Sequence, residues 1–320
     1  MRRIAVTTAG GDAPGMNACL RAVVRSAIYY GFEVVGFEEG YWGLIKDKKR
    51  KMDLRSVSGI ISWGGTILNT KRCEEIKTRE GIKEAIKVLK RNRIDGLITI
   101  GGDGAFRGGI ELYQAGGIPL VGIPASIDND IAGTEDTIGF DTAVNTALCA
   151  IQKIRDTASS HERIFIIEVM GRERGFIALA VGLACGAEII LVPEIKYNLT
   201  KISRQLEEGR KSGKKSSIIV MAEGAGTAYA IAHQIKDVTG YETRVSVVGY
   251  IQRGGSPTAR SVNLANLFGH QAVKVLMRTK VAKMVGWERG RVVVLSLDYS
   301  AKHRKEIDEN LYRLAHILAI

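Results

Sequence analysis

Two carboxylates lie two residues apart in the stretch GIPASIDND, residues 122–130, directly after an apolar run. In an extended segment residues two apart share a face, so Asp128 and Asp130 can both point into one site. Close to a magnesium-bound phosphate, one carboxylate can help to hold the metal while the other accepts a proton from an attacking hydroxyl. Because Asp, Asn and Ser are also ordinary turn residues, this stretch taken alone fits a simple loop equally well.

Two glycine-rich segments that contain an aspartate precede this stretch, GGD at residues 10–12 and GGDG at residues 101–104. Glycines admit a phosphate close to the backbone, and N–H groups at the start of a helix can face an anion. Asp103 is placed to hold a cation beside that phosphate. Glycine pairs are common in turns, but two such segments in consecutive strand–helix units favour a site for nucleotide phosphates.

Phosphoryl transfer also needs cations that stabilise the charge on the transferred group. Arg72, in TKRCE, and Arg172, in VMGRERG, are candidates for this role. The acceptor needs its own anchors, and Glu223, Arg244 and Arg253 lie in similar polar segments. With these residues added, phosphoryl transfer is favoured over the simple loop.

The segments that carry these residues follow predicted β-strands. The strands are expected at residues 4–8, 33–37, 96–100, 119–123, 164–169, 188–192, 217–222, 244–249 and 291–297, and helices at 18–30, 81–91 and 106–114. This alternation predicts mainly parallel sheets covered by helices, in which ligands bind beyond the carboxyl ends of the strands. Segments before residue 131 are acidic and glycine-rich, whereas later ones carry arginines. We therefore predict an α/β fold with two Rossmann-like three-layer α/β/α lobes and a cleft between them.

Composition and motifs exclude several other classes of protein. The net charge of +12 favours anionic partners, but no DNA- or RNA-binding pattern appears, so small phosphorylated ligands fit better than nucleic acid. A Walker A loop around Lys214 is excluded because Glu208 stands where a glycine is required. No GxGxxG pattern follows a predicted strand, which disfavours a dinucleotide cofactor.

The cellular location is expected to be cytoplasmic. The four cysteines are far apart and form no CxxC pair, which is typical of a reducing compartment rather than of a zinc site or a disulfide framework. The N-terminus has too short an apolar run for a signal peptide. The apolar segment 176–192 contains Glu188 and several glycines, so a buried helix followed by a strand is expected there, and no membrane span.

The chain resembles the bacterial-type ATP-dependent 6-phosphofructokinase family along nearly its whole length. The motifs that carry the resemblance are GGDAPGMNA (10–18), GGT (64–66), IGGDG (100–104), IDNDI.GT..TIGFDTA (127–143), RDTASSHER (155–163), EVMGR..G (168–175), YETR (241–244) and IQRGGSPTA (251–259). The resemblance implies transfer of the γ-phosphate of MgATP to the 1-hydroxyl of fructose 6-phosphate. It also implies a nucleotide-binding domain of residues 1–138 plus 252–304 and a sugar-phosphate-binding domain of residues 139–251 plus 305–320.

The resemblance assigns roles to residues at the matching positions. Asp128 is the proton acceptor, and Asp103 binds magnesium with help from Asp130. The implied catalytic residues are Asp128, Arg172, Ser126 and Arg72. The implied nucleotide contacts are Gly11, Tyr41, Arg72, Cys73, Gly102, Asp103, Gly104 and Ala105.

The sugar-phosphate site is implied in the same way. Its residues are Ser126, Ile127, Asp128, Arg163, Met170, Gly171, Arg172, Glu223, Arg244, Tyr250, Ile251, Gln252 and Arg253. Arg163 and Arg244 correspond to residues that reach the sugar phosphate of a neighbouring subunit. The resemblance thus implies a homotetramer with shared active sites.

The phosphoryl donor in this family is either ATP or pyrophosphate. Relatives that use pyrophosphate have Asp where this chain has Gly104, and Lys where it has Ala125. An Asp side chain in place of Gly104 would fill the space that the α-phosphate of ATP needs. Its negative charge would also repel that phosphate. The chain is therefore expected to use ATP.

Several positions depart from the family pattern, and Tyr250 is the most important, because the family has a His there that contacts the phosphate of the sugar. A buried core tyrosine is an alternative interpretation of Tyr250. Together with Ala125 and with Ser261, which replaces a usual Asp, Tyr250 leaves open a kinase of the same fold for another sugar, sugar phosphate or polyol. A weakly catalytic regulatory subunit is a further alternative, which the presence of Asp128 and Arg172 disfavours.

Basic residues also match an effector site of the family for ADP or phosphoenolpyruvate. Arg21 and Arg25 lie four residues apart on one face of a predicted helix, where like charges repel unless an anion compensates them. The other implied residues are Arg155, Gly186, Glu188, Lys214 and Lys215. A solvated basic face is the alternative explanation.

Overall fold

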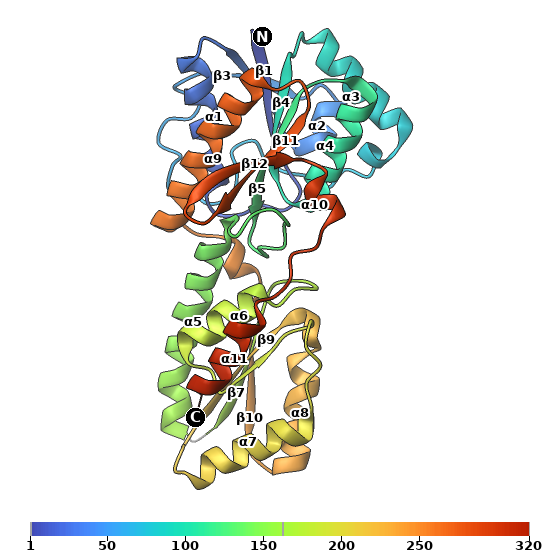
Figure 1. Cartoon of the computed structure of the whole chain (residues 1–320). Coiled ribbons are helices and arrows are strands. Elements are labelled where there is room, and N and C mark those ends of the chain that lie inside the picture. The colour runs from blue at the N-terminus through green and yellow to red at the C-terminus, as the bar shows by residue number, and fades with distance from the viewer. Residues whose placement is uncertain (1, 162, 320) are drawn as a thin grey trace. The chain divides into compact units, whose positions relative to one another are not determined.

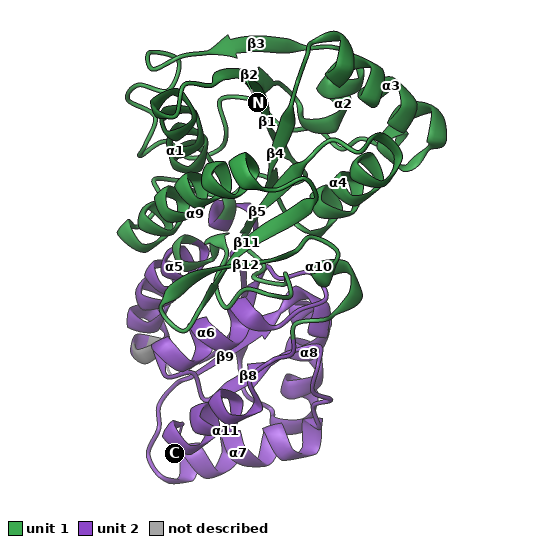
Figure 2. Cartoon of the chain, turned by 45° about the horizontal axis from the view of Figure 1, so that its top comes forward, with its two compact units in different colours: residues 1–142, 253–305 green, residues 143–252, 306–320 purple. Residues whose placement is uncertain are grey.

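The computed structural model describes residues 2–161 and 163–319, which divide into two compact units. Unit 1 comprises Met1–Thr142 and Arg253–Lys305, and unit 2 comprises Ala143–Gln252 and Glu306–Ile320; Figure 2 colours them green and purple. Each unit contains its own sheet and its own buried core. What each unit binds stays a prediction at this stage.

Unit 1 is built on a mainly parallel sheet. Its strands are β1 (Arg3–Ala9), β2 (Glu33–Phe37), β3 (Lys49–Met52), β4 (Gly96–Gly101), β5 (Leu120–Ser126), β6 (Ile138–Gly139), β11 (Ala282–Glu288) and β12 (Arg291–Ser296). They lie in the order β12-β11-β5-β4-β1-β2-β3, and β6 pairs with β5. The pairs β2–β3 and β11–β12 are antiparallel, and the other pairs are parallel, so the carboxyl ends of β1, β4 and β5 share one edge.

Helices cover both faces of this sheet. They are α1 (Met16–Tyr29), α2 (Gly40–Ile45), η1 (Glu75–Lys77), α3 (Arg79–Arg91), α4 (Asp103–Gly116), α9 (Ala259–Arg278) and α10 (Tyr299–Lys302). Figure 1 shows α1 and α9 on one side of the sheet and α3 and α4 on the other. Phe37, Phe106 and Leu97 belong to one buried apolar cluster of the unit, which fixes α4 against the sheet.

Unit 2 has a smaller sheet in which every pair is parallel. Its strands are β7 (Ile164–Val169), β8 (Ile189–Leu191), β9 (Ser217–Ala222) and β10 (Thr243–Val247), in the order β10-β7-β9-β8. Its helices are α6 (Phe176–Cys185), η2 (Glu223–Ala225), α7 (Leu199–Lys211), α8 (Ala228–Thr239) and α11 (Glu309–Leu318). Two elements, α5 (Phe140–His161) and η3 (Gly249–Arg253), begin in one unit and end in the other.

The predicted fold class of two lobes with mainly parallel sheets is confirmed, and each predicted strand is present within a few residues. The apolar segment after Gly175 forms α6 and then β8, as expected for a buried helix followed by a strand. None of the described helices is both long and apolar enough to cross a membrane.

The close packing of α1 against α9 depends on Gly269. A Cβ at this position would lie 2.7 Å from Cβ of Ala22 and 2.9 Å from the carbonyl oxygen of Cys19. Gly269→Ala is therefore expected to lower the free energy of unfolding by about 1–3 kcal/mol, because the helices must move apart. Denaturant unfolding measures this change.

Gly209→Ala on α7 is the matched control for this substitution. The added Cβ would lie 3.5 Å from Cδ of Lys214, an ordinary contact. Alanine should stabilise this helix by about 0.5–1 kcal/mol, so an equal loss of stability in both variants would contradict the packing argument.

Candidate active site

The segment that carries Asp128 and Asp130 leaves the end of β5 and forms a turn. Asn129 lies between the two carboxylates with φ 52°, in the left-handed region. The expected extended geometry, with both carboxylates on one face of a strand, is therefore wrong. Ser126 links them instead, because its hydroxyl donates to Oδ1 of Asp130 at 3.1 Å and accepts the backbone N–H of Asp128 at 3.2 Å.

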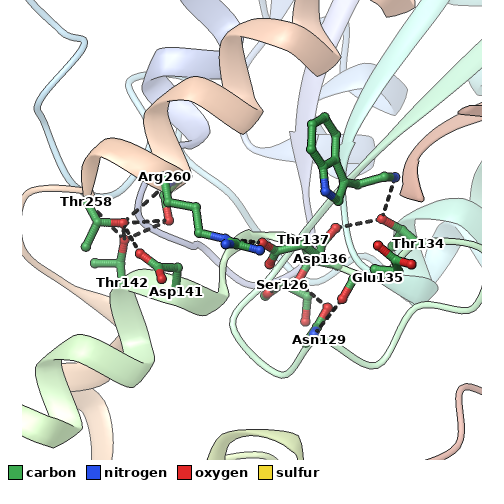
Figure 3. A network of polar contacts seen from close by, with 12 residues as sticks. Ser126, Asn129, Thr134, Glu135, Asp136, Thr137, Asp141, Thr142, Thr258 and Arg260 are labelled. Carbon is green, nitrogen blue, oxygen red and sulfur yellow. Dashed lines mark hydrogen bonds and ion pairs between the residues drawn. The ribbon is translucent and has the colours of Figure 1, made fainter. Parts of the chain in front are cut away.

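Polar contacts hold this turn in the interior of unit 1. Thr137 donates its hydroxyl to the carbonyl oxygen of Ser126 at 2.5 Å, and Asn129 donates its amide to the carbonyl of Glu135 at 3.1 Å (Figure 3). Asp128 is 4% exposed, so its carboxylate is largely shielded from water. A base in such a place can act on a bound hydroxyl without competition from bulk solvent.

The glycine turn after β1 lies against Arg253. A Cβ on Gly11 would lie 2.6 Å from Nη1 of Arg253. The same guanidinium donates to the carbonyl of Asp12 at 3.3 Å and lies 3.8 Å from the Asp12 carboxylate. Gly11 and Arg253, predicted to bind the nucleotide and the sugar phosphate respectively, are thus in contact within unit 1.

The second glycine segment forms the N-terminus of α4. Gly102 is the N-cap residue and Asp103 is the first helical residue, with its carboxylate accepting from Nε of Arg107 at 2.7 Å. Gly104 is exposed, and a Cβ added there would meet no described atom within 4 Å. The first turn of a 14-residue helix presents N–H groups and a positive dipole end, which suits a phosphate.

Tyr41 lies in the core rather than on a surface that a nucleotide can reach directly. It is 3% exposed, and burial raises its pKa. Its hydroxyl donates to the carbonyl of Ala105 at 2.6 Å. This hydrogen bond holds the first turn of α4 from the core side. Arg72 is exposed, and the neighbouring Cys73 is half-buried with its thiol 3.5 Å from Glu75.

A third group of predicted residues meets in unit 2, where β7 ends. The backbone N–H of Met170 donates to Oε1 of Gln252 at 2.9 Å, and Gly171 has φ 142°. Arg172 follows with φ 53°, and its N–H donates to Oε1 of Glu223 at 2.7 Å. Glu223, predicted as an anchor for the acceptor, therefore also holds the backbone that carries Arg172.

Glu242 brings together the two arginines predicted to serve a neighbouring subunit. Nε of Arg163 donates to Oε2 of Glu242 at 2.8 Å, and Arg244 forms an ion pair with the other oxygen. The hydrogen bond from Arg163 lowers the pKa of Glu242 below its ordinary value. Sequence reasoning missed Glu242, although it lies in the YETR motif.

The exposure of Tyr250 excludes the alternative interpretation of this residue as a buried core tyrosine. Tyr250 is 82% exposed and Ile251 is 61% exposed, so Tyr250 is not a core tyrosine. Gln252 is fully buried beside them, and Ile127 is also buried. Ser261 is buried in a hydroxyl network, in which its hydroxyl oxygen accepts from Thr142 at 2.9 Å.

The predicted effector residues fall in both units. Arg21 and Arg25 lie on α1, where burial and the charge of Arg25 lower the pKa of Arg21. In unit 2, Arg155 donates to the carbonyl of Cys185 at 2.6 Å and to that of Gly186 at 3.4 Å, at the C-terminus of α6. This is where a helix favours a cation.

The remaining effector residues contact one another or the chain end. Lys214 lies 3.7 Å from Glu188 and donates to the carbonyl of Ala319 at 2.6 Å, and Lys215 beside it is exposed. Glu188 accepts the backbone N–H of Ile218 at 2.7 Å.

The donor set suits a magnesium ion that arrives with a nucleotide. Among the described residues, no three His, Cys, Asp or Glu side chains form a group that could hold a metal by themselves. Magnesium in phosphoryl-transfer sites is usually held by one or two carboxylates, substrate phosphates and water. Asp103 follows β4 and Asp130 follows β5, and their carboxylates fit this chemistry.

Comparison with known proteins places the chain in a family. The family model described as phosphofructokinase matches residues 3–276. The chain belongs to the phosphofructokinase family. It is 52% identical to the ATP-dependent 6-phosphofructokinase of Halalkalibacterium halodurans over 320 residues and 49% identical to that of Halothermothrix orenii over 332 residues. Both alignments cover 100% of this chain and 100% of the relative.

Solved structures of other phosphofructokinases share the fold. The phosphofructokinase of Saccharomyces cerevisiae superposes with a TM-score of 0.91 at 32% identity, over 100% of this chain and 48% of that one. This chain thus spans about half the length of the yeast phosphofructokinase. A pyrophosphate-dependent phosphofructokinase from Marinobacter aquaeolei superposes with a TM-score of 0.86 at 24% identity, over 97% of this chain and 86% of that one, and supports the fold alone.

Proposed function

We propose that this phosphofructokinase uses ATP to phosphorylate the 1-hydroxyl of fructose 6-phosphate, giving fructose 1,6-bisphosphate and ADP in glycolysis. The observation that carries the proposal is the similarity over the full length of both chains to relatives named ATP-dependent 6-phosphofructokinase. The open position at Gly104 supports ATP as the donor, because no described atom lies within 4 Å of where a Cβ at this position would be, which leaves space for the nucleotide phosphates.

Asp128 is the base in this mechanism. It takes the proton of the 1-hydroxyl as the oxygen bonds to the γ-phosphorus, and the bond between that phosphorus and the β–γ bridging oxygen breaks. The hydroxyl of Ser126 orients both carboxylate residues: it accepts the backbone N–H of Asp128 and donates to the carboxylate of Asp130. Arg72 and Arg172 supply positive charge for the transferred group.

Magnesium, when bound with ATP, neutralises charge on the phosphate oxygens. Asp103 and Asp130 would hold it. Gly11, Gly102 and Ala105 present backbone to the nucleotide, and Glu223, Arg253 and the segment Met170–Arg172 contact the sugar phosphate.

A second candidate is transfer to another sugar, sugar phosphate or polyol. The exposed Tyr250 favours it, because this position is free to contact a ligand and lacks the charge of a protonated His. A screen of fructose 6-phosphate, tagatose 6-phosphate, sedoheptulose 7-phosphate and unphosphorylated sugars, with MgATP and with magnesium pyrophosphate, tests both candidates. A kcat/KM preference above about tenfold for a different acceptor, worth about 1.4 kcal/mol, would reverse the proposal.

The proposal also includes a homotetramer in which Arg163 and Arg244 serve the site of a neighbour, with ADP or phosphoenolpyruvate as effectors. The exposure of Arg244, Tyr250 and Ile251 supports it, because exposed side chains are available to a neighbouring subunit. Sedimentation analysis tests the assembly, and a monomeric active enzyme would contradict it. The cytoplasmic location stays a prediction.

Gly11→Ala is expected to lower kcat/KM for fructose 6-phosphate by about tenfold, because the new Cβ would displace the guanidinium of Arg253. Steady-state kinetics measures this loss. Gly254→Ala is the matched control, since its Cβ would meet no described atom within 4 Å while lying next to Arg253 in the chain. Equal losses in both variants would show that contact with Arg253 is not the cause.

A further inference from the structure

The segment between β5 and β6 contains four acidic residues, two of which are buried. Residues 127–137 contain the four carboxylates of Asp128, Asp130, Glu135 and Asp136. Asp128 is 4% exposed and Asp136 is 5% exposed. Like charges at such density oppose the folded arrangement unless cations or hydrogen bonds compensate them.

The C-terminal part of this segment, residues 134–136, forms hydrogen bonds with the β11–β12 hairpin and with α9. The hydroxyl of Thr134 accepts the N–H of Trp287 at 2.9 Å, and the N–H of Glu135 donates to the carbonyl of Trp287 at 2.8 Å. Arg260 on α9 donates to Oδ2 of Asp136 at 2.7 Å (Figure 3). Oδ1 of Asp136 is buried and has no hydrogen-bond partner among the described atoms. The negative charge at this oxygen therefore needs a nearby positive charge to stabilise it.

Lys305, near the end of the second stretch of unit 1, supplies a cation at this place. Its Nζ donates to the carbonyl oxygen of Glu135 at 2.9 Å. The same carbonyl accepts the side-chain amide of Asn129, the residue between Asp128 and Asp130, at 3.1 Å. Burial lowers the pKa of Lys305 to about 8, and the charges of Asp136, Asp130 and Glu135 act in the opposite direction. The amine therefore remains mostly protonated at neutral pH.

These contacts form a short chain from Lys305 to the proposed base. Lys305 fixes the carbonyl of Glu135, that carbonyl fixes Asn129, and Asn129 holds the left-handed turn between the two carboxylates. A left-handed conformation at a residue other than glycine persists only where its surroundings hold it.

We propose that Lys305 is a positioning residue for phosphoryl transfer, a tethered cation that balances Asp130 and Asp136 and fixes the turn of Asp128 before metal and nucleotide bind. The inference rests on the proposed function, which supplies the role of Asp128. It adds a residue outside the sequence motifs of the site.

Removal of the amine tests the proposal. Lys305→Ala is expected to lower kcat at least about tenfold while KM for fructose 6-phosphate changes less than about threefold, because substrate contacts remain and only the turn is displaced. Methylammonium, which fits the space left by the side chain, should restore part of kcat. Tetramethylammonium at the same ionic strength should not.

Three further variants separate charge from packing. Lys305→Met keeps most of the volume without the charge and should lose the same activity, and it replaces Lys305→Ala if that variant does not fold. Lys305→Arg retains a cation and should lose less. Lys302→Ala, which removes an exposed lysine paired with Asp298, should leave kcat unchanged. A wild-type kcat in Lys305→Ala or Lys305→Met, or equal recovery with both ammonium salts, would overturn the proposal.

Hydrogen exchange without substrates provides a readout that is independent of activity. Amides of residues 127–137 should exchange at least about tenfold faster in Lys305→Met than in the wild type, while the amides of β7 and β9 stay unchanged. Unchanged exchange in 127–137 would refute the positioning role. If the wild type fails to phosphorylate fructose 6-phosphate, the proposed function fails, and the exchange experiment still decides whether Lys305 holds the turn.

Discussion

Asp128→Asn is expected to lower kcat by about 10²–10⁴-fold, because the amide keeps the shape of the side chain but cannot accept the proton of the sugar hydroxyl. Affinity for ATP should change less than about threefold, since no nucleotide contact is assigned to this side chain. Steady-state kinetics and equilibrium ATP binding measure the two quantities. An unchanged melting temperature serves as the control for folding.

Turnover close to that of the wild type in Asp128→Asn would remove the base from the mechanism. It would also revive the weakly catalytic regulatory subunit, because such a protein has no need of a proton acceptor. A large loss of ATP affinity together with kcat would instead assign Asp128 to the binding of the nucleotide or its metal.

Gly104→Asp should have the second largest effect, a loss of about 10²-fold or more in kcat/KM for ATP. The added carboxylate would lie in the first turn of α4, where it repels the nucleotide phosphates and fills the space beside them. The backbone should accept the change, because a Cβ at Gly104 would meet no described atom within 4 Å. Gly104→Ala is the matched control and should retain most of the activity.

A Gly104→Asp enzyme that uses ATP as well as the wild type would contradict the donor assignment. Gain of pyrophosphate use is not expected from this change alone. Ala125 is buried and offers no compensating cation where pyrophosphate-using relatives have Lys.

Much of the fold follows from local sequence patterns. The strands at 33–37, 164–169 and 217–222 have the predicted bounds, because β-branched and other apolar residues fill most of their positions and glycines or charged residues lie close to their ends. β3 was not predicted, since KRKM consists largely of cations and forms a strand only by pairing with β2 at the sheet edge. β11 was missed for a related reason, because AKMVGWE lacks a clear alternation of polar and apolar residues.

The sequence predicts which segments form the site, but it does not predict how their side chains are arranged in space. Glycines and carboxylates after strands indicate where a ligand binds, since the sheet brings strand ends together. The left-handed turn at Asn129 depends on its contacts with Glu135 and Thr137, and the burial of Tyr41 depends on residues distant in the sequence such as Ala105. Neither follows from the periodicity of a helix or a strand. Glu242 and Lys305 were missed because their partners, Arg163 and the carbonyl oxygen of Glu135, lie far away in the sequence.

The left-handed backbone of Arg172 sets up a conflict between heat resistance and turnover. An L-residue at φ 53° lies roughly 1–2 kcal/mol above its relaxed conformation, whereas glycine has no such cost. Selection for thermal tolerance alone would therefore favour glycine at residue 172 and would discard the guanidinium with it. Engineering of a more robust enzyme from this chain should leave that position untouched and seek its gains elsewhere.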